Sequence, residues 1–474
     1  MRVDFLRQLA ARGVKVERLS SDSRRCAPGV AFFAYPGEVA DGRRHIGDAI
    51  ARGASAVCWE EKDFSWRAEW QVPNVAIAGL KQRAGELAHE FYGRASESLW
   101  VCGVTGTNGK TSCSQWLAAL LEKTAVIGTL GAGFPGALSD AVNTTPDALE
   151  LQFLLKNFLE RGARAVSMEV SSHGLAQGRV NGVRFACALF TNLSHDHLDY
   201  HGTMPRYAAA KASLFEMPGL KAAVLNLDDA LGAELARRLA GRVRTIGYSL
   251  SPQQPVGVDE YLFARAANEI ESSWGRAAVR IPVLGRFNVS NALGVLGCLV
   301  ANGVPFEEGA RLLAKLPPVP GRMQAVGDEP LVVIDYAHTP DALENVLQAL
   351  RPVAVARGGR LAVVFGAGGD RDRSKRPLMG AVAARLADRV LITSDNPRSE
   401  EPLSIIEAIR GGAPSAELEA DRARAIEKVI ASAQPNDVVL IAGKGHETYQ
   451  EIAGRRTHFS DEEQARAAMA RRSA

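Results

Sequence analysis

The chain has 474 residues, a net charge of +3, a hydrophobic fraction of 46% and a charged fraction of 23%. This length exceeds one ordinary core, so we expect two or three domains of roughly 100–200 residues each. The charge is spread along the chain, which argues against a nucleic-acid-binding protein as a class. The first residues lack a signal-peptide pattern, and no run reaches the roughly 18 apolar residues of a membrane span, which argues against a membrane protein.

The first section of the chain, residues 1–97, contains short strand-like runs separated by helical patterns such as residues 46–52. The runs lie at residues 29–35, 54–59 and 74–78. The stretch Gly93-Arg-Ala-Ser-Glu-Ser then has the composition of a linker.

A second section begins with an apolar strand at Leu99-Trp-Val-Cys-Gly-Val-Thr, which runs into a glycine-rich loop and a helix expected over residues 112–123. Further buried-strand candidates lie at residues 165–170, 186–191 and 222–226. The segment Leu316-Pro-Pro-Val-Pro-Gly is a stiff break. Four more apolar strands follow it, at residues 331–335, 360–365, 389–393 and 437–442.

Strands that alternate with helices predict an α/β protein with doubly wound, mostly parallel sheets. We place three domains at residues 1–97, 98–320 and 321–474. Ligands of such sheets bind beyond the carboxyl ends of the strands, so the chemistry is expected in the residues that follow each strand.

The six cysteines are far apart in the sequence and form no C-x-x-C pair. They are Cys26, Cys58, Cys102, Cys113, Cys187 and Cys298. This usage is typical of buried, reduced thiols in a cytosolic protein rather than of a disulfide framework or a metal site. We therefore expect a cytoplasmic location.

The glycine-rich loop is Gly103-Val-Thr-Gly-Thr-Asn-Gly-Lys-Thr, between a strand and a helix. Such a loop turns backbone N–H groups toward phosphate oxygens in front of a helix N-terminus. Lys110 can reach the β- and γ-phosphates, and the Thr111 hydroxyl can bind Mg²⁺. The motif predicts a nucleotide site formed by Gly106, Thr107, Asn108, Gly109, Lys110 and Thr111. It does not define the reaction, because kinases, GTPases and ligases all use such loops.

Carboxylates and imidazoles follow two other strands. Glu169 ends the apolar run Ala165-Val-Ser-Met-Glu, where it is either a solvated charge or a metal ligand at the nucleotide crevice. The next strand leads into Thr191-Asn-Leu-Ser-His-Asp-His-Leu-Asp-Tyr-His, in which three histidines and two aspartates lie within seven residues. Together these residues predict a divalent-cation site, which phosphoryl transfer requires.

Lys211 lies in the largely apolar stretch Tyr207-Ala-Ala-Ala-Lys-Ala-Ser-Leu-Phe. Such a lysine is most often at the surface or ion-paired. A desolvated lysine instead has a lowered pKa. Its neutral amine can then take up CO₂ as a carbamate and serve as a metal ligand.

Four motifs together carry a resemblance to a known family. They are the glycine-rich loop, Glu169-Val-Ser-Ser-His-Gly-Leu, Asp196-His-Leu-Asp-Tyr-His and Asp335-Tyr-Ala-His-Thr-Pro. Over essentially its whole length the chain resembles the Mur ligases of peptidoglycan synthesis, in particular those that add the third residue of the stem peptide. The resemblance implies a uridine-nucleotide domain, a central ATPase domain and a C-terminal Rossmann-like domain for the incoming amino acid.

The activity that the resemblance implies is ATP-dependent addition of meso-2,6-diaminopimelate to the γ-carboxylate of D-Glu in UDP-N-acetylmuramoyl-L-Ala-D-Glu, through an acyl phosphate. It makes Lys110, Lys211, Glu169 and His197 catalytic, and it surrounds Mg²⁺ with Thr111, Glu169, His197 and a carbamylated Lys211. His197 is preferred to His195, where relatives commonly carry Arg. We expect a monomer.

Further contacts are implied residue by residue. For ATP they are Asn288, Asn291, Arg322, Asp335 and His338, in addition to the loop. For the UDP-sugar peptide they are Ser21, Ser23, Asn143, Thr144, Thr145, Ser171, Gln177 and Arg179, although Asn143-Thr-Thr-Pro would also form an ordinary turn. For diaminopimelate they are Arg371, Asp395, Asn396, Pro397, Arg398, Gly443 and Glu447.

The C-terminal motifs Asp395-Asn-Pro-Arg and Gly443-Lys-Gly-His-Glu each follow a predicted strand. Arg398 can hold the far carboxylate of diaminopimelate bidentately, while Asn396 and Glu447 can accept hydrogen bonds from its ammonium. Arg371 is a second candidate for the carboxylate. A lysine substrate would leave the arginine unpaired.

Three alternatives remain at the level of sequence. A lysine-adding ligase would need a different residue at Arg398, and a folylpolyglutamate-type ligase would not need residues 1–97. A P-loop protein that binds ATP without ligation would not need Lys211.

Overall fold

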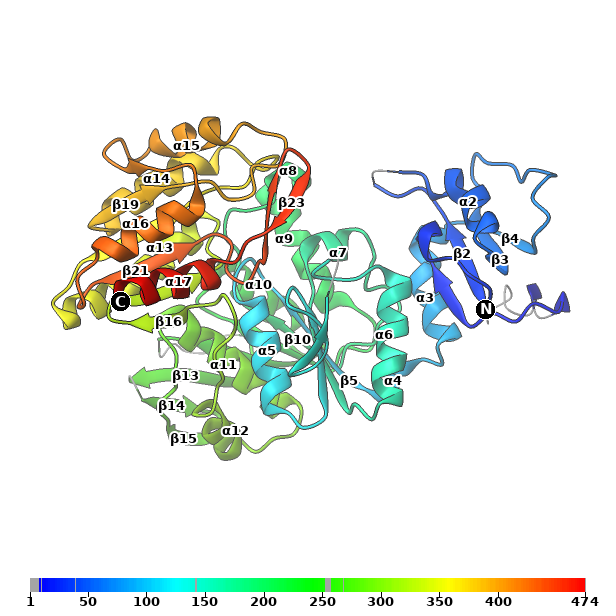
Figure 1. Ribbon diagram of the computed structural model, residues 1–474. Helices are drawn as coiled ribbons and strands as arrows, with labels where there is room; N and C mark the ends of the chain where they lie inside the picture. Colours follow the sequence, from blue (N-terminus) through cyan, green and yellow to red (C-terminus); the bar gives the residue numbers. More distant parts are fainter. Residues whose placement is uncertain are drawn as a thin grey trace.

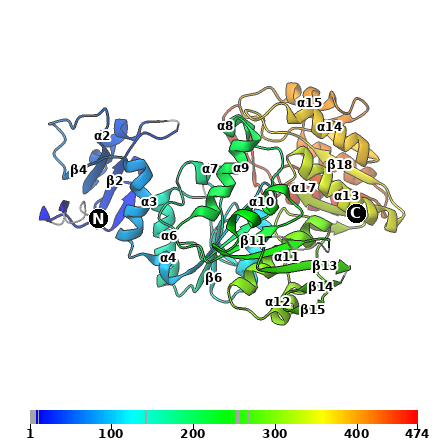
Figure 2. The ribbon, with the colours of Figure 1, turned by 180° about the vertical axis from the view of Figure 1, so that it is seen from behind.

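The computed structural model describes residues 8–9, 11–38, 40–140, 143–251, 257–266 and 268–473. Three α/β domains follow one another along the chain, and the N-terminal and C-terminal domains lie on opposite sides of the central one (Figures 1 and 2). Among the helices of the described residues, none is long and apolar enough to span a membrane.

The N-terminal domain is built on a four-stranded parallel sheet in the order β1-β2-β3-β4. All residues of β2 and β3 are buried because both faces of the sheet are covered. Its elements are β1 (Arg18–Ser20), η1 (Ser23–Arg25), β2 (Val30–Ala34), η2 (Gly42–His45), α2 (Ile46–Ala51), β3 (Ala56–Glu60), β4 (Asn74–Ile77) and α3 (Leu80–Phe91).

The segment predicted as a linker is instead helical at α4 (Ala95–Ser98). Ala95 and Leu99 are buried in the core of the central domain, so this segment is fixed by apolar packing. Contact between the domains is made by α3 and α6 (Ala148–Glu160), and Leu149 of α6 belongs to the core cluster beneath α3.

The central domain contains an eleven-stranded sheet in the order β15-β14-β13-β12-β11-β10-β5-β9-β6-β7-β8. The seven strands from β13 to β6 are parallel, and antiparallel strands extend both edges. The strands are β5 (Trp100–Thr105), β6 (Thr124–Gly128), β7 (Gly131–Phe134), β8 (Ala137–Ser139), β9 (Ala165–Glu169), β10 (Cys187–Phe190), β11 (Ala222–Asn226), β12 (Arg244–Ser249), β13 (Glu260–Ala266), β14 (Glu269–Ser272) and β15 (Gly275–Ala278).

Two layers of helices cover this sheet. One face packs against α6, α9 and α10, and the other packs against α5, α11 and α12. The helices are α5 (Lys110–Leu120), α7 (Ser172–Ala176), α8 (Leu198–His201), α9 (Met204–Ala212), η3 (Ser213–Glu216), α10 (Ala230–Leu239), α11 (Arg286–Ala301) and α12 (Phe306–Leu313). Helix α5 begins two residues before the predicted start because Gly109, with φ of 86°, ends the loop there.

The C-terminal domain has a six-stranded sheet in the order β16-β17-β21-β18-β19-β20, parallel except for β16. Helices α13, α14 and α15 cover one face, and α16 and α17 cover the other. The elements are β16 (Gln324–Asp328), β17 (Leu331–Asp335), α13 (Pro340–Arg357), β18 (Leu361–Phe365), α14 (Lys375–Leu386), β19 (Arg389–Ile392), α15 (Pro402–Arg410), β20 (Glu417–Leu418), α16 (Arg422–Ser432), β21 (Val438–Ala442), the hairpin of β22 (Tyr449–Ile452) and β23 (Arg455–His458), and α17 (Asp461–Ser473).

Candidate active site

A cavity of about 870 Å³ is lined by residues of the central and C-terminal domains. It begins where β5 ends, at the point where the chain leaves the middle of the sheet for α5. Most of the residues predicted to bind ATP and metal line it, namely Thr107, Asn108, Gly109, Lys110, Thr111, Glu169, His197, Lys211, Asn288, Asn291, Arg322, Asp335 and His338. Asn143, Thr144, Ser171, Arg179 and Arg371 line the same cavity.

The glycine-rich loop is tightly packed at its two ends. A Cβ atom at Gly106 would lie 1.8 Å from Thr191 Oγ1, and one at Gly109 would lie 2.4 Å from Asn291 Oδ1. Glycine is therefore required at both positions for the backbone to pass so close to its neighbours.

Two of the loop N–H groups that the sequence assigned to phosphate are already bonded within the protein. Thr107 N–H donates to Asn192 O at 2.8 Å, and Asn108 N–H donates to Asn192 Oδ1 at 2.9 Å. In this structure these two N–H groups therefore face Asn192. The first turn of a helix has N–H groups without partners inside the helix, so the start of α5 offers further backbone donors beside the loop.

Two lysine amines meet at the same loop carbonyl. Lys110 Nζ donates to Gly106 O at 2.8 Å and to Thr107 O at 2.7 Å, and Lys211 Nζ donates to Gly106 O at 2.8 Å. Lys211 is 1% exposed. Burial lowers the pKa of Lys211 well below its usual range and also lowers the pKa of Lys110. The arrangement favours anions beside Lys110 and a neutral amine at Lys211.

Oxygen atoms suitable for a hard cation converge beside the loop. The Thr111 hydroxyl donates to Glu169 Oε2 at 3.0 Å, and the other carboxylate oxygen accepts from Thr129 N at 2.8 Å. Glu169 is 1% exposed and Thr111 is 4% exposed. A buried carboxylate and hydroxyl side by side fit the oxygen ligands that Mg²⁺ prefers.

His197 lines the same cavity as this pair and lies at the start of α8, with φ of 54°. Its ring packs edge-on against His173, with centroids 4.8 Å apart. Burial lowers the pKa of His197 to about 3, so the imidazole is neutral and able to act as a ligand. Asp196 lies 3.4 Å from its Nε2.

The C-terminal domain contacts the phosphate loop directly. Arg322 Nη2 donates to Thr111 Oγ1 at 3.1 Å, and its guanidinium lies over the Tyr336 ring. Asn108 Nδ2 donates to Asp341 Oδ2, in the first turn of α13, at 3.1 Å. Asp341 was not predicted as a site residue, although it directly follows the motif Asp335-Tyr-Ala-His-Thr-Pro.

Of the other ATP candidates of this domain, Asp335 is buried and His338 is half-buried. Asp335 accepts hydrogen bonds from Met323 N and Ala337 N, and burial raises its pKa. His338 Nδ1 lies 2.8 Å from Tyr336 O. On the central side, Asn291 Nδ2 donates to Asn288 Oδ1 at 3.3 Å within α11.

Residues assigned to the UDP-sugar peptide form a connected group. Thr145 Oγ1 donates to Ser171 Oγ at 3.2 Å, and Arg179 donates to Thr145 O at 2.8 Å and to Gln177 Oε1 at 2.9 Å. On the N-terminal domain, Ser21 hydrogen-bonds Tyr35. Burial and the nearby charge of Asp147, in the central domain, raise the pKa of Tyr35 to about 12. Tyr35 of the N-terminal domain therefore lies close to charged groups of the central domain. Ser23 begins η1 nearby in the sequence.

The two C-terminal loops assigned to the amino acid lie against each other. Asn396 Nδ2 donates to Glu447 Oε2 at 2.8 Å, and Lys444 Nζ donates to Asn396 Oδ1 at 3.1 Å and to Glu447 Oε2 at 3.2 Å. Lys444 is completely buried, and it was not among the predicted diaminopimelate contacts although it lies in the motif Gly443-Lys-Gly-His-Glu. Asn396 Oδ1 also accepts from Glu451 N, so its oxygen is already used.

Arg398 lies beside this pair in a left-handed backbone conformation, with φ of 54°. Its Nη1 donates to Gly369 O at 2.7 Å, which brings it next to the loop that carries Arg371. Arg371 is exposed, and its own Nη1 donates to Asp370 O. Asp395 and Pro397 are buried, and a Cβ at Gly443 would lie 2.5 Å from Asp395 Oδ2.

A strand, a glycine-rich loop, a helix that begins with Lys-Thr, and a buried carboxylate beside the threonine define a P-loop nucleotide-binding protein. Three family descriptions match the chain in succession. "Mur ligase family, catalytic domain" matches residues 15–92, "Mur ligase middle domain" matches 104–299, and "Mur ligase, glutamate ligase domain" matches 321–445.

Similar proteins extend this match over the full chain. A UDP-N-acetylmuramoyl-L-alanyl-D-glutamate–2,6-diaminopimelate ligase of Chromobacterium violaceum is 50% identical and covers 95% of this chain and 93% of its own. The protein of the same name from Pseudomonas aeruginosa is 50% identical and covers 97% and 96%. The chain belongs to the Mur ligase family.

Solved structures agree with this assignment. A structure of a protein with that same name is 39% identical, with a TM-score of 0.65 and coverage of 97% of this chain and 96% of the other. The MurF ligase of Thermotoga maritima, solved with ADP, has a TM-score of 0.65 at 21% identity, which supports the fold alone. The expected α/β class with N-terminal, central and C-terminal domains is therefore confirmed.

Proposed function

We propose that this protein is an ATP-dependent ligase of peptidoglycan synthesis that joins meso-2,6-diaminopimelate to the γ-carboxylate of D-Glu in UDP-N-acetylmuramoyl-L-Ala-D-Glu. One observation carries the proposal. The phosphate loop, the Thr111–Glu169 pair and Lys211 share one cavity with residues of the C-terminal domain. This is the arrangement that transfer of phosphate to a carboxylate, followed by attack of an amine, requires.

The first step places phosphate on the D-Glu γ-carboxylate. Lys110 and the N–H groups at the start of α5 hold the phosphates of ATP and stabilise the charge that develops during transfer. Arg179, bonded to Thr145 O and Gln177 Oε1, contributes a cation for the carboxylates of the UDP-sugar peptide.

In the second step an amine attacks the acyl phosphate, phosphate leaves and an amide forms. Water would hydrolyse the acyl phosphate, so the reacting groups must be enclosed. The Arg322–Thr111 and Asn108–Asp341 hydrogen bonds already join the C-terminal domain to the phosphate loop. They support a closed arrangement during the reaction.

Magnesium would be held by Thr111, Glu169, His197 and a carbamate on Lys211, and it would neutralise the phosphates when bound. The carbamate is supported by the burial of Lys211 and by its contact with a carbonyl rather than a carboxylate. The Lys211 amine adds to CO₂ and loses a proton, which gives an anionic oxygen ligand. Mg²⁺ would compensate the charge of this anion, so that no unpaired charge is buried.

The amine substrate carries a carboxylate and an ammonium at its far end. Arg398 binds that carboxylate, and Glu447 binds the ammonium. Asn396 orients Glu447 through its amide, because its own oxygen is occupied by Lys444 and Glu451. Arg371 is the second cation near the site. We further propose that the protein acts in the cytoplasm as a monomer.

Phosphate release with UDP-N-acetylmuramoyl-L-Ala-D-Glu and ATP tests the proposal. We expect turnover with meso-diaminopimelate and at least about 100-fold lower kcat/KM with L-lysine, because lysine leaves the Arg398 charge unpaired. Equal turnover of both amines would remove the role of Arg398. A rate of ATP hydrolysis that does not depend on the amine or on the UDP-sugar peptide would refute the proposed ligase activity.

A further inference from the structure

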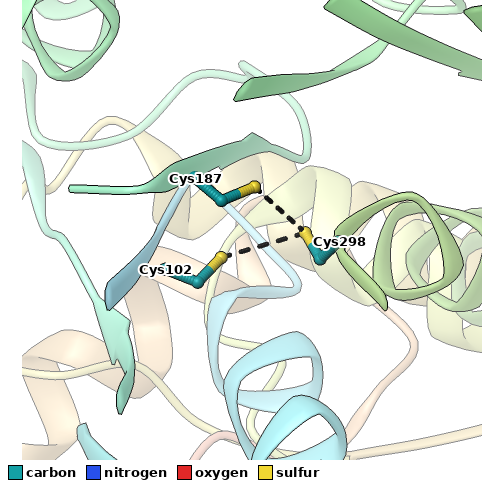
Figure 3. Close-up of side chains that lie close together, drawn as sticks. All are labelled: Cys102, Cys187 and Cys298. Atoms are coloured by element: carbon teal, nitrogen blue, oxygen red, sulfur yellow. Dashed lines mark hydrogen bonds between the residues drawn. The ribbon is translucent and has the colours of Figure 1, made fainter. Parts of the chain in front are cut away.

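Three cysteines of the central domain direct their sulfur atoms toward one another (Figure 3). Cys102 lies on β5, Cys187 is its register partner on β10, and Cys298 lies on α11. Cys298 Sγ is 3.8 Å from Cys102 Sγ and 4.0 Å from Cys187 Sγ, and all three sulfur atoms lie within 4.8 Å of one another. All three residues are free thiols and 0% exposed. Three separate elements thus present sulfur to one point.

The surroundings of these thiols are apolar. Val104, Leu189 and Val295 belong to the same core cluster. Burial raises the pKa of the Cys298 thiol well above its usual range. Packing alone requires only small apolar side chains at these positions, and free cysteine commonly serves in that way. Three sulfur atoms that converge on one point can bind a sulfur-seeking atom together, which alanine or valine side chains could not do.

We propose that Cys102, Cys187 and Cys298 form a binding site for trivalent arsenic, taken up as arsenous acid. Three As–S bonds form and three As–O bonds break. Each thiol proton leaves with one hydroxyl group as water, so three waters are released. Arsenic remains trivalent and sulfur remains at the thiol level, so the reaction needs neither an oxidant nor a reductant.

Charge favours arsenic over a metal ion at this site. The thiolate is the form of cysteine that binds metals, and three thiolates around Zn²⁺ or Cu⁺ leave a net negative charge. Such a charge is costly in an apolar core, and zinc also prefers four ligands where the described cluster offers three sulfur atoms. The arsenic adduct of three thiols is uncharged, and its valence matches the three sulfur atoms.

Access to the buried sulfur atoms requires a local opening between α11 and the sheet, which native proteins undergo at a measurable rate. Once formed, the adduct cross-links β5, β10 and α11 and so stabilises the folded chain. Helix α11 also carries Asn288 and Asn291, which line the nucleotide cavity, so the adduct lies behind one wall of that cavity.

Native mass spectrometry of the reduced, full-length protein tests the proposal, after incubation with sodium arsenite just below the melting temperature. We expect one adduct per chain, heavier than the protein by one arsenic atom less three hydrogen atoms, together with a higher Tm. An adduct on two thiols retains a hydroxyl group and has a larger mass. A hydroxyl-retaining adduct, or no adduct, on the wild-type protein would overturn the proposal.

Variants locate the adduct. Cys298→Ala should remove the three-sulfur adduct and leave at most the hydroxyl-retaining form, whereas Cys26→Ala, in the N-terminal domain, should keep it. An unchanged three-sulfur adduct on Cys298→Ala would place arsenic elsewhere and refute the site. Cys187→Ala provides the same comparison if circular dichroism shows that Cys298→Ala does not fold. Zinc chloride in place of arsenite should give no retained metal, and retained zinc would contradict the preference for an uncharged adduct.

Discussion

The two halves of the candidate active site hold their buried charges differently. In the central half, Lys110 and Lys211 donate to backbone carbonyls of the phosphate loop. In the C-terminal half, two buried cations are paired with carboxylates, Lys444 with Glu447 at 3.2 Å and Arg422 with Asp461 at 2.7 Å. Unpaired buried cations are costly until an anion arrives, whereas paired ones are satisfied in advance.

This difference matches the ligands that we propose. A polyphosphate is strongly anionic, and the central half has the Lys110 amine available for it. The far end of diaminopimelate carries one positive and one negative group, and a nearly neutral, preorganised site suits it. The central half therefore depends on its ligand for electrostatic balance, and the C-terminal half depends on its own salt bridges.

The largest effect is expected from Lys110→Met, which removes the amine that faces the phosphates. Loss of one group that stabilises transition-state charge typically costs about 10²–10³ in kcat. We expect phosphate release to fall by at least about 10³-fold, since the amine also binds ATP. Lys156→Met, on the exposed side of α6, is the matched control. Turnover within tenfold of wild type would contradict the role of Lys110.

Lys211→Ala tests whether the second amine acts as a carbamate. We expect turnover to fall by about 10²-fold through weaker metal binding. Acetate or formate should restore part of the activity, because a small carboxylate can replace the missing anionic ligand. Lys221→Ala, at an exposed position, should neither lose activity nor respond to acetate. A loss without rescue would indicate that Lys211 supports the loop only as an amine.

Arg398→Ala tests whether the C-terminal half of the site binds the far carboxylate of diaminopimelate. A hydrogen bond to a charged group contributes about 1.5–3 kcal/mol, so kcat/KM for meso-diaminopimelate should fall about 10–100-fold. The kcat/KM for L-lysine should fall far less. The ratio of kcat/KM for meso-diaminopimelate to kcat/KM for L-lysine should therefore decrease. Arg410→Ala, whose side chain is 46% exposed, is the control. An equal loss for both amines would mean that Arg398 supports the loop rather than the carboxylate.

The smallest effect concerns acid stability of the C-terminal domain. Hydrogen bonds from Arg376 lower the pKa of Glu400 from 4.5 to about 2. Because the folded-state pKa is below the unfolded one, this stabilisation is complete above pH 4.5 and is lost as pH falls toward 2. Urea unfolding of Glu400→Gln should therefore show lower stability at pH 7 and a smaller further loss on acidification. Glu407→Gln, in an exposed pair, should follow the wild type.

Apolar runs were the most reliable guide to the fold. The predicted strands at residues 165–170, 222–226 and 331–335 correspond to β9, β11 and β17, because strands covered on both faces are uniformly apolar. The antiparallel strands at the two ends of the central sheet, β7, β8, β14 and β15, were not predicted, since each has only three or four residues. The supposed linker is a helix because Ala95 and Leu99 have a place in the central core that sequence patterning does not reveal.

The site shows the same division between local and long-range information. A local motif identified Lys110 and Thr111. It could not show that Asn192, far along the chain, occupies the N–H groups of Thr107 and Asn108. Likewise, Asp341 reaches Asn108 only because the C-terminal domain lies against the loop. Lys444 was overlooked because its buried position between Asn396 and Glu447 depends on two loops that meet only in the fold.

The Thr111 hydroxyl has two partners from different domains. It donates to Glu169 of the central domain and accepts from Arg322 of the C-terminal domain. A ligand that binds this oxygen therefore changes the free energy of the interface as well as that of the loop. Thermodynamic reciprocity then requires that anything which shifts the C-terminal domain also alters affinity at the loop. We therefore expect nucleotide binding at the loop and amino-acid binding to the C-terminal domain to be thermodynamically linked through this oxygen atom.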